Sequence, residues 1–236
     1  MRCAHEGGEA ALRKLLVRLD PDLGRRVQLV AVNGGGFVVT STPGERIFLY
    51  RSAMTEIESA ALPALLAHEL SHIRHGDAMS AVIRHNGFVS TWAAIMDGSG
   101  RRMLVMDFSG LEERRADLEA MQMMRSARIP LAPAAKMFEE MRVSKAQRGF
   151  YGYDLRDFHF GIDARAQRWA AASRSDPSAA PPLLTGQDSD DLYNFCWTGP
   201  IKALPGDQKR APMPAPPGQG GLTPAGPSDS VTDKGA

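Results

Sequence analysis

The sequence has little cysteine, almost no net charge and no long apolar run, and each shortage excludes a class of protein. Two cysteines, Cys3 and Cys196, cannot build the dense disulfide framework of a small secreted domain. They lie near opposite ends of the 236 residues, so they could pair only if the tail folded back. A formal net charge of +1, with acidic and basic residues intermixed, argues against a nucleic-acid partner.

No stretch of the sequence reads as a secretory signal or as a membrane span. The N-terminal residues are charged and lack an apolar core. The most apolar later stretch, residues 87–96, is too short to cross a bilayer. We therefore expect a cytoplasmic protein without an integral membrane segment, or a periplasmic one if the natural chain begins earlier.

Proline is scarce in the first part of the chain and abundant after Ser175. Eleven of the sixteen prolines lie beyond that residue, and residues 211–236 offer almost nothing to bury. We therefore expect one folded domain over residues 1–175 and a Pro/Gly-rich, largely disordered tail over residues 176–236. An acidic-aromatic segment of this tail, residues 188–197, either docks on the domain or on a partner, or is a chance cluster.

The expected elements place helices around one small sheet, so we predict a mainly helical α+β fold. Three short β-like runs, separated by glycines and by Pro43-Gly44, predict a small antiparallel sheet or hairpin. Apolar residues at helical spacing predict the helices, of which the one over 60–75 has Ser59 as its expected N-cap and Gly76 as its C-cap. The runs cover 26–32, 36–42 and 45–51, and the helices cover 9–19, 60–75, 78–96, 110–127, 133–146 and 164–173.

Residues 65–77, with the sequence LLAHELSHIRHGD, contain three of the six histidines. In a helix His68 and His72 lie on one face, so their imidazoles can converge on one tetrahedral ion. Glu69 lies about 100° further around the helix, beside such an ion, where its carboxylate can take a proton from a metal-bound water. This H-E-x-x-H pattern predicts zinc-assisted hydrolysis. The apolar neighbours predict a buried helix, in which polar side chains need partners.

A catalytic zinc ion needs a third protein ligand. Ala78 stands where an extended form of the motif would place a histidine, and His75 at the helix end is expected to cap the helix or face solvent. The third ligand is therefore expected to be an acidic residue on a separate helix.

The helix expected at 110–127 supplies four acidic residues. Ser109 and Glu112 have the spacing of a capping box, which gives Glu112 a structural task at the start of the helix. Glu113 and Asp117 then share a face, so one can bind zinc while the other accepts a hydrogen bond from a zinc-bound histidine. The alternative is that this helix presents only a charged, solvated face.

Both motifs together, HELSH and E-x-x-A-D at residues 113–117, resemble those of the gluzincin metallopeptidases, closest to the HtpX-like, CAAX-prenyl-protease-like and Oma-type branch. The resemblance covers roughly residues 10–173 and implies a zincin-like domain whose small sheet packs on the active-site helix. It implies one Zn²⁺ ion, with Glu69 as general base and Asp117 in support of a ligand histidine. The implied zinc ligands are His68, His72 and Glu113.

The same family carries a later His-Pro segment that is followed by an arginine near the metal. The matching stretch here is DFHFGIDARAQRW, although Phe160 replaces the usual proline. The resemblance implies a catalytic role for His159, which would polarise the scissile carbonyl or shield the metal. It implies a supporting role for Arg165.

We therefore expect a zinc-dependent metalloendopeptidase that acts on a protein or peptide substrate. The run at 45–51 is expected to pair with an extended peptide. One alternative is a regulatory protease of narrow specificity, and another is a catalytically inactive, zinc-stabilised binding module whose tail recruits partners. A further alternative is latency, in which Cys196 of the tail occupies the zinc.

Overall fold

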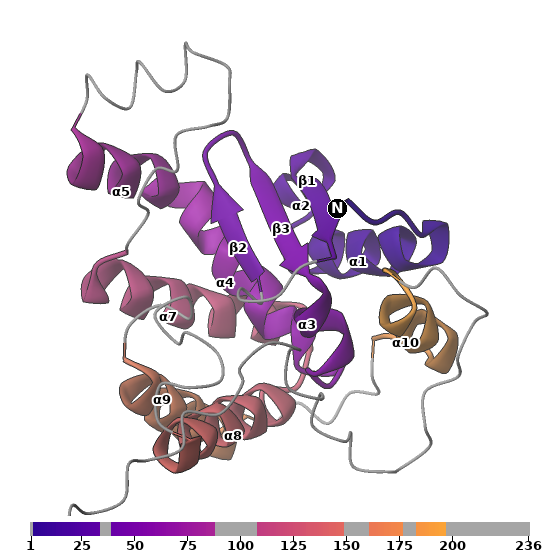
Figure 1. Ribbon diagram of the computed structural model, residues 1–236. Helices are drawn as coiled ribbons and strands as arrows, with labels where there is room; N and C mark the ends of the chain where they lie inside the picture. The colour runs from indigo at the N-terminus through magenta and orange to yellow at the C-terminus, as the bar shows by residue number, and fades with distance from the viewer. Residues whose placement is uncertain (1, 34–38, 88–107, 149–160, 177–182, 197–236) are drawn as a thin grey trace, which may run out of the picture. The chain divides into compact units, whose positions relative to one another are not determined.

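The computed structural model describes residues 2–33, 39–87, 108–148, 161–176 and 183–196 (Figure 1). Helices dominate this part of the chain and three strands form one small sheet, as expected for a mainly helical α+β fold. The elements are α1 (Glu6–Leu19), α2 (Leu23–Arg26), β1 (Gln28–Val32), β2 (Val39–Thr42), β3 (Arg46–Tyr50), α3 (Arg51–Thr55), α4 (Leu62–His75), α5 (Asp77–Asn86), α7 (Gly110–Ser126), α8 (Ala132–Arg148), α9 (Ile162–Arg174) and α10 (Gly186–Tyr193).

The sheet has the order β1-β3-β2 and is mixed, which corrects the expectation of an antiparallel sheet. The strands β2 and β3 form the expected antiparallel hairpin, and Gly44 in their turn has a φ of 89°. β1 pairs in parallel with the other side of β3, with Gln28 opposite Arg46. One reversal between β1 and β2 and a second between β2 and β3 leave β1 and β3 running the same way.

Because β3 is the central strand, the expectation that residues 45–51 pair with a peptide substrate is wrong. Both edges of β3 are occupied, one by β1 and the other by β2. An added strand needs an unpaired edge. Within the described residues, β1 and β2 are the edge strands of this sheet.

The helix α4, which carries the HELSH motif, is buried from Leu62 to His72. It packs against β2 on one side and α7 on another (Figure 1). Pro63 lies in its first turn, where the missing N–H needs no partner. The helix ends as predicted at Gly76, whose φ of 66° is left-handed, but it begins at Leu62 instead of residue 60. Ser59 does not cap it, and its hydroxyl lies 3.0 Å from that of Ser189.

The acidic-aromatic segment that the sequence assigned to the tail folds as α10 and packs against α1. Thr185 and Asp188 form a capping box at its start, and Lys14 of α1 lies 3.0 Å from Asp188. The two helices approach closely because α1 has a glycine at the contact. A Cβ atom on Gly8 would lie 2.2 Å from the ring of Phe195.

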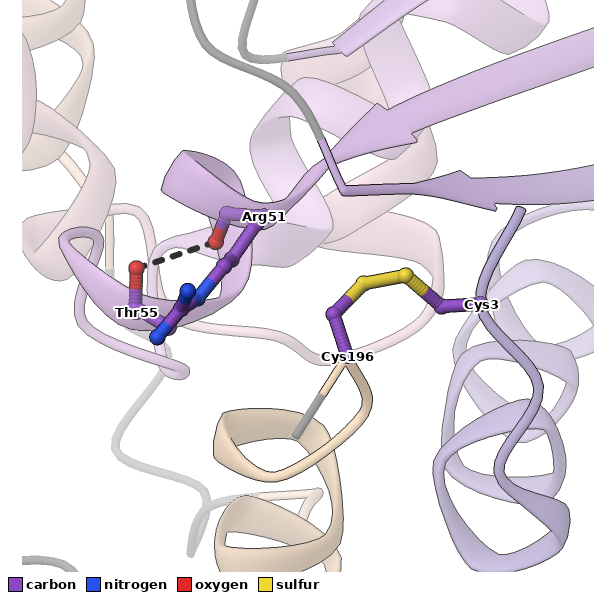
Figure 2. Close-up of a disulfide and its surroundings, with 4 residues drawn as sticks. All are labelled: Cys3, Arg51, Thr55 and Cys196. Carbon is purple, nitrogen blue, oxygen red and sulfur yellow. Dashed lines mark hydrogen bonds between the residues drawn. A yellow bond between two sulfur atoms is a disulfide. The ribbon is translucent and has the colours of Figure 1, made fainter. Parts of the chain in front are cut away.

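A disulfide joins Cys3 to Cys196, so the tail does fold back, which is the condition that the sequence set for this pairing (Figure 2). The backbone N–H of Cys3 donates to the carbonyl oxygen of Ala31 in β1, while Cys196 lies in the turn after α10. Figure 2 shows the bond beside α3, where the hydroxyl of Thr55 donates to the carbonyl oxygen of Arg51 at 3.0 Å. The pairing depends on α10 docking against α1, which spacing in the sequence does not reveal. It also removes Cys196 as a zinc ligand.

The helices α8 and α9 pack against each other and bring a third set of side chains toward α4 and α7. Trp169 of α9 stacks on Phe138 of α8, and the Arg165 guanidinium lies 4.7 Å from the centre of the same ring. Arg165 is thereby fixed on the buried side of α9, facing α7. Among the described residues, no helix is both long enough and apolar enough to cross a membrane.

Candidate metal centre

His68 and His72 of α4 face Glu113 of α7, and all three side chains are buried. The two Nε2 atoms are 3.0 Å apart. Glu113 places Oε2 at 3.3 Å from His68 Nε2 and Oε1 at 3.4 Å from His72 Nε2. A tetrahedral zinc ion with bonds of about 2.0–2.1 Å separates its ligand atoms by roughly 3.3 Å. The cluster therefore has the spacing of a metal site, and its one acid and two imidazoles match the donors that zinc binds.

The capping box of α7 explains why Glu113 faces α4. Glu112 accepts a hydrogen bond from the backbone N–H of Ser109 at 2.6 Å, and its own N–H donates to the Ser109 hydroxyl at 3.3 Å. The capping role predicted for Glu112 is confirmed, and its carboxylate also binds Arg84 of α5. The next residue, Glu113, is turned by 100° to the buried side of the helix.

Asp117 is completely buried and supports the far nitrogen of His68, with Oδ1 at 3.2 Å from Nδ1. Arg165 donates to it through Nε and Nη2, the latter at 2.8 Å. Arg168 Nη2 donates at 2.7 Å and Trp169 Nε1 at 3.3 Å. The sequence had singled out Asp117 and Arg165 but missed Arg168 and Trp169, which lie one turn further along the face of α9 that carries Arg165.

Burial alone would raise the pKa of Asp117, but the charge of Arg165 and the hydrogen bond from His68 hold it far below its ordinary value. Burial likewise opposes the charged form of Arg165, yet the charges of Asp117 and Glu113 hold its pKa above the ordinary value. Both groups therefore stay ionised. A buried ion pair of this kind is strongly destabilised when one partner is removed, because the other charge is then left without compensation.

Two neighbours of His68 Nδ1 favour different positions of the imidazole proton. Arg165 Nη2 and Asp117 Oδ1 both lie 3.2 Å from this atom. A guanidinium can only donate, whereas a carboxylate can only accept, so the two contacts require different tautomers of His68. With a metal on Nε2 the proton resides on Nδ1, which selects the hydrogen bond to Asp117.

His72 has a support of its own, which the sequence analysis missed. Its Nδ1 lies 2.8 Å from Oδ2 of Asp77, a buried carboxylate at the start of α5. Arg115 of α7 binds both oxygens of Asp77, and Phe108 stacks on the His72 ring with the centroids 4.0 Å apart. Burial raises the pKa of Asp77, but the hydrogen bonds from His72 and Arg115 outweigh burial and lower it. The sequence feature that could have indicated this role is the position of Asp77, directly after Gly76 at the end of the helix.

Glu69 is buried and points toward the sheet. Its Oε2 accepts a 2.7 Å hydrogen bond from the backbone N–H of Ser41 in β2. Since this N–H is directed at α4, Ser41 turns its backbone away from β3, and the outer edge of β2 faces the helix that carries Glu69.

Two further histidines had been considered from the sequence. His75 lies 2.7 Å from Glu119 with a third of its side chain exposed, and it does not belong to the cluster. His159 lies outside the described residues, so its catalytic role stays a prediction.

The comparisons with known proteins agree with the fold and the cluster. The sequence matches the family model of Peptidase family M48 over residues 28–202. A comparison with the curated proteins found no match to this chain. The matched range covers most of the sequence and includes α4 and α7, which carry His68, His72 and Glu113. The chain therefore belongs to peptidase family M48 and has the zincin-like α+β fold of that family.

Proposed function

We propose that this chain is a zinc-dependent metalloendopeptidase in which His68, His72 and Glu113 bind the metal. The observation that carries the proposal is the spacing of 3.0–3.4 Å among the two histidine Nε2 atoms and the carboxylate oxygens of Glu113. A second observation supports it. Each histidine has a carboxylate next to Nδ1, which directs the lone pair of Nε2 toward the shared space.

A zinc ion held there would activate a water molecule and polarise the carbonyl of a peptide bond. Glu69 is the general base of the proposal, because it neighbours His68 on the same buried helix. It removes the proton of the attacking water and returns it to the leaving amine. The Ser41 hydrogen bond holds Oε2 of Glu69 and so orients the carboxylate for this transfer. His159 is a further catalytic residue of the proposal, with Arg165 in a supporting role.

The proposed test compares wild type with Glu69→Gln and Glu113→Gln, measuring zinc content and cleavage of a peptide library on each. Glutamine at position 69 keeps an oxygen for the Ser41 N–H but cannot carry the proton. Glu69→Gln should retain one zinc ion per chain and lose about 10²–10⁴-fold in kcat. Glu113→Gln should lose zinc as well as activity.

Two outcomes would overturn the proposal. Full activity of Glu69→Gln would exclude Glu69 as the base. Bound zinc without cleavage by the wild type would favour a zinc-stabilised binding module instead. Cleavage of a single protein and of no library peptide would indicate a regulatory protease of narrow specificity.

We further propose that a peptide substrate pairs with the outer edge of β2. The Ser41 N–H is held by Glu69, so the support comes from Val39, which lies two residues earlier and turns its own backbone groups to the same outer edge of β2. Val39→Pro removes one outward N–H and should raise KM. Leu29→Pro is the matched control, because it removes an outward N–H from β1, the edge strand on the opposite side of β3. Equal effects of the two prolines on KM would contradict a role of β2 in substrate binding.

The cytoplasmic location expected from the sequence stays a prediction, and the disulfide argues against it. Disulfides persist in oxidising compartments and are rare in the cytosol. The bond between Cys3 and Cys196 therefore favours the periplasmic alternative. Thiol labelling of the protein in intact cells tests this, because cytosolic protein would label at both cysteines without prior reduction.

A further inference from the structure

The turn between α4 and α5 brings a second carboxylate to the metal centre. Gly76 ends α4 in the left-handed conformation, and α5 begins at the next residue. The turn at Gly76 places the Asp77 carboxylate beside the last turns of α4, where Oδ2 reaches His72 Nδ1 at 2.8 Å. Asp77 is only 3% exposed, so the contact is shielded from water.

The Asp77 carboxylate is itself held in place by α7. Arg115 Nη2 donates to Oδ1 at 2.5 Å and to Oδ2 at 2.6 Å. Arg115 lies two residues after Glu113, so one helix carries both the acidic member of the cluster and the arginine that fixes Asp77. The carboxylate therefore has little freedom to leave His72.

A carboxylate at Nδ1 accepts the Nδ1 proton, which fixes the tautomer whose Nε2 lone pair can bind a metal. It also fixes the rotation of the ring, which Phe108 restricts further by stacking on it. We propose that Asp77, held by Arg115, is a positioning residue that prepares His72 for metal binding. The inference rests on the proposed function, because it assumes that His72 binds the metal.

The structure supplies a matched control for this idea. Two carboxylate–arginine pairs join α5 to α7, namely Asp77 with Arg115 and Glu112 with Arg84. Both pairs tie the same two helices together, but Asp77 also contacts His72 of the cluster, whereas Glu112 caps the start of α7. A loss of α5–α7 attachment should therefore appear in variants of both pairs, whereas a loss of His72 positioning should appear only in variants of Asp77.

The experiment measures Zn²⁺ affinity of the full chain by competition with a chromophoric chelator, for wild type, Asp77→Asn and Glu112→Gln. We expect Asp77→Asn to bind Zn²⁺ about 10–100-fold more weakly, as is usual when the partner of a metal-bound histidine is lost. Glu112→Gln should stay within about twofold of wild type. Visible absorption of the Co²⁺-loaded proteins gives a second readout, and only the Asp77 variant should shift its bands.

Melting of the metal-free proteins shows whether folding accounts for the result. The inference is overturned if Asp77→Asn and Glu112→Gln bind Zn²⁺ equally well, or if their affinities fall in proportion to their stabilities. Failure of the wild type to bind Zn²⁺ would instead overturn the proposed function, which keeps the two failures distinguishable. Arg115→Lys adds a graded variant and should weaken binding less than Asp77→Asn, because the carboxylate remains in place.

Discussion

The metal centre and the contact between α1 and α10 both join segments that are far apart in the sequence, but they use different forces. At the centre α4, α7 and α9 meet through buried carboxylates, arginines and histidines. We call the other contact the α1–α10 clasp. There Cys3 is bonded to Cys196, and Gly8 of α1 lies against Phe195, next to α10. A disulfide and close apolar packing hold the clasp, with a charge pair, Lys14 with Asp188, at its rim.

This difference suggests that one region serves metal binding and the other serves the stability of the fold. Buried charges are a weak way to stabilise a fold, because their desolvation opposes the attraction between them. The charges at the centre are therefore better explained by the orientation of His68 and His72. The clasp does not include His68, His72 or Glu113, and its disulfide and packing act on the stability of the folded chain. Variants of the centre should change metal affinity, whereas variants of the clasp should change the free energy of unfolding alone.

The largest effect is expected from Asp117→Ala. This variant of the metal centre should lower both the zinc affinity and the free energy of unfolding. Removal of this carboxylate leaves Arg165 charged and buried, which costs about 3–5 kcal/mol of stability. Zinc affinity should also fall by about 10–100-fold, since His68 loses its partner. Urea unfolding of the metal-free protein and zinc titration measure the two effects. The control is Glu139→Ala, which removes an exposed partner of Arg142 and should leave both measurements unchanged.

Removal of the disulfide should affect stability alone. Replacing both Cys3 and Cys196 by serine is expected to lower the free energy of unfolding by about 2–5 kcal/mol. Metal affinity should stay within about twofold of wild type, because the clasp does not contact His68, His72 or Glu113 through any described interaction. Urea unfolding without reductant, followed by zinc titration in native buffer, tests both statements. A tenfold loss of zinc affinity would show that the two regions are coupled.

A smaller effect is expected from alanine at the helix contact. Gly8→Ala places a Cβ against the buried ring of Phe195 and should destabilise by about 1–3 kcal/mol. Gly7→Ala is the matched control, since its Cβ meets the end of the Asp191 side chain, which can rotate away. Alanine also favours a helix over glycine by roughly 0.5–1 kcal/mol, so Gly7→Ala should be neutral or stabilising. Thermal melting of the two variants should therefore give shifts of different size.

The smallest effect concerns the charge at the rim of the clasp. Burial raises the pKa of Asp188, but hydrogen bonds from the Thr185 backbone and from Lys14 outweigh burial and lower it. The folded state therefore binds a proton less readily than the unfolded state, whose aspartate has a pKa of about 3.9. Asp188 contributes its stability above that value and loses it as the pH falls further. Asp188→Asn should cost at most about 1 kcal/mol at pH 7 and less than that near pH 3, as measured by urea unfolding at both pH values.

The parts of the fold that depend on local sequence were predictable. The helix of the HELSH motif, its end at Gly76 and the capping box at Ser109 follow from spacing that is complete within one element. The same holds for Glu113 and Asp117, because four residues along a helix place both on one face. The expectation that these two helices meet came from the third ligand that a zinc site needs and from the family resemblance, and the contact between α4 and α7 confirms it.

The missed features all depend on contacts between distant segments. The parallel pairing of β1 with β3 depends on which edge of the hairpin β1 reaches, and no local pattern encodes that choice. The role of Asp77 beside His72 depends on the turn at Gly76 between two helices, so helical spacing alone could not reveal it. The disulfide depends on α10 folding within a proline-rich stretch, where composition had predicted disorder.

The disulfide joins two cysteines that are 193 positions apart in the sequence, and the whole metal centre lies between them. This matters for a peptidase whose copies can cleave one another. A single cut at any peptide bond between Cys3 and Cys196 leaves two fragments that are still covalently joined. Self-digestion at one bond would thus go unseen on a gel run without reductant, and the nicked molecule could keep its folded core. Preparations of this protein therefore need a reduced gel before their activity is assigned to the intact chain.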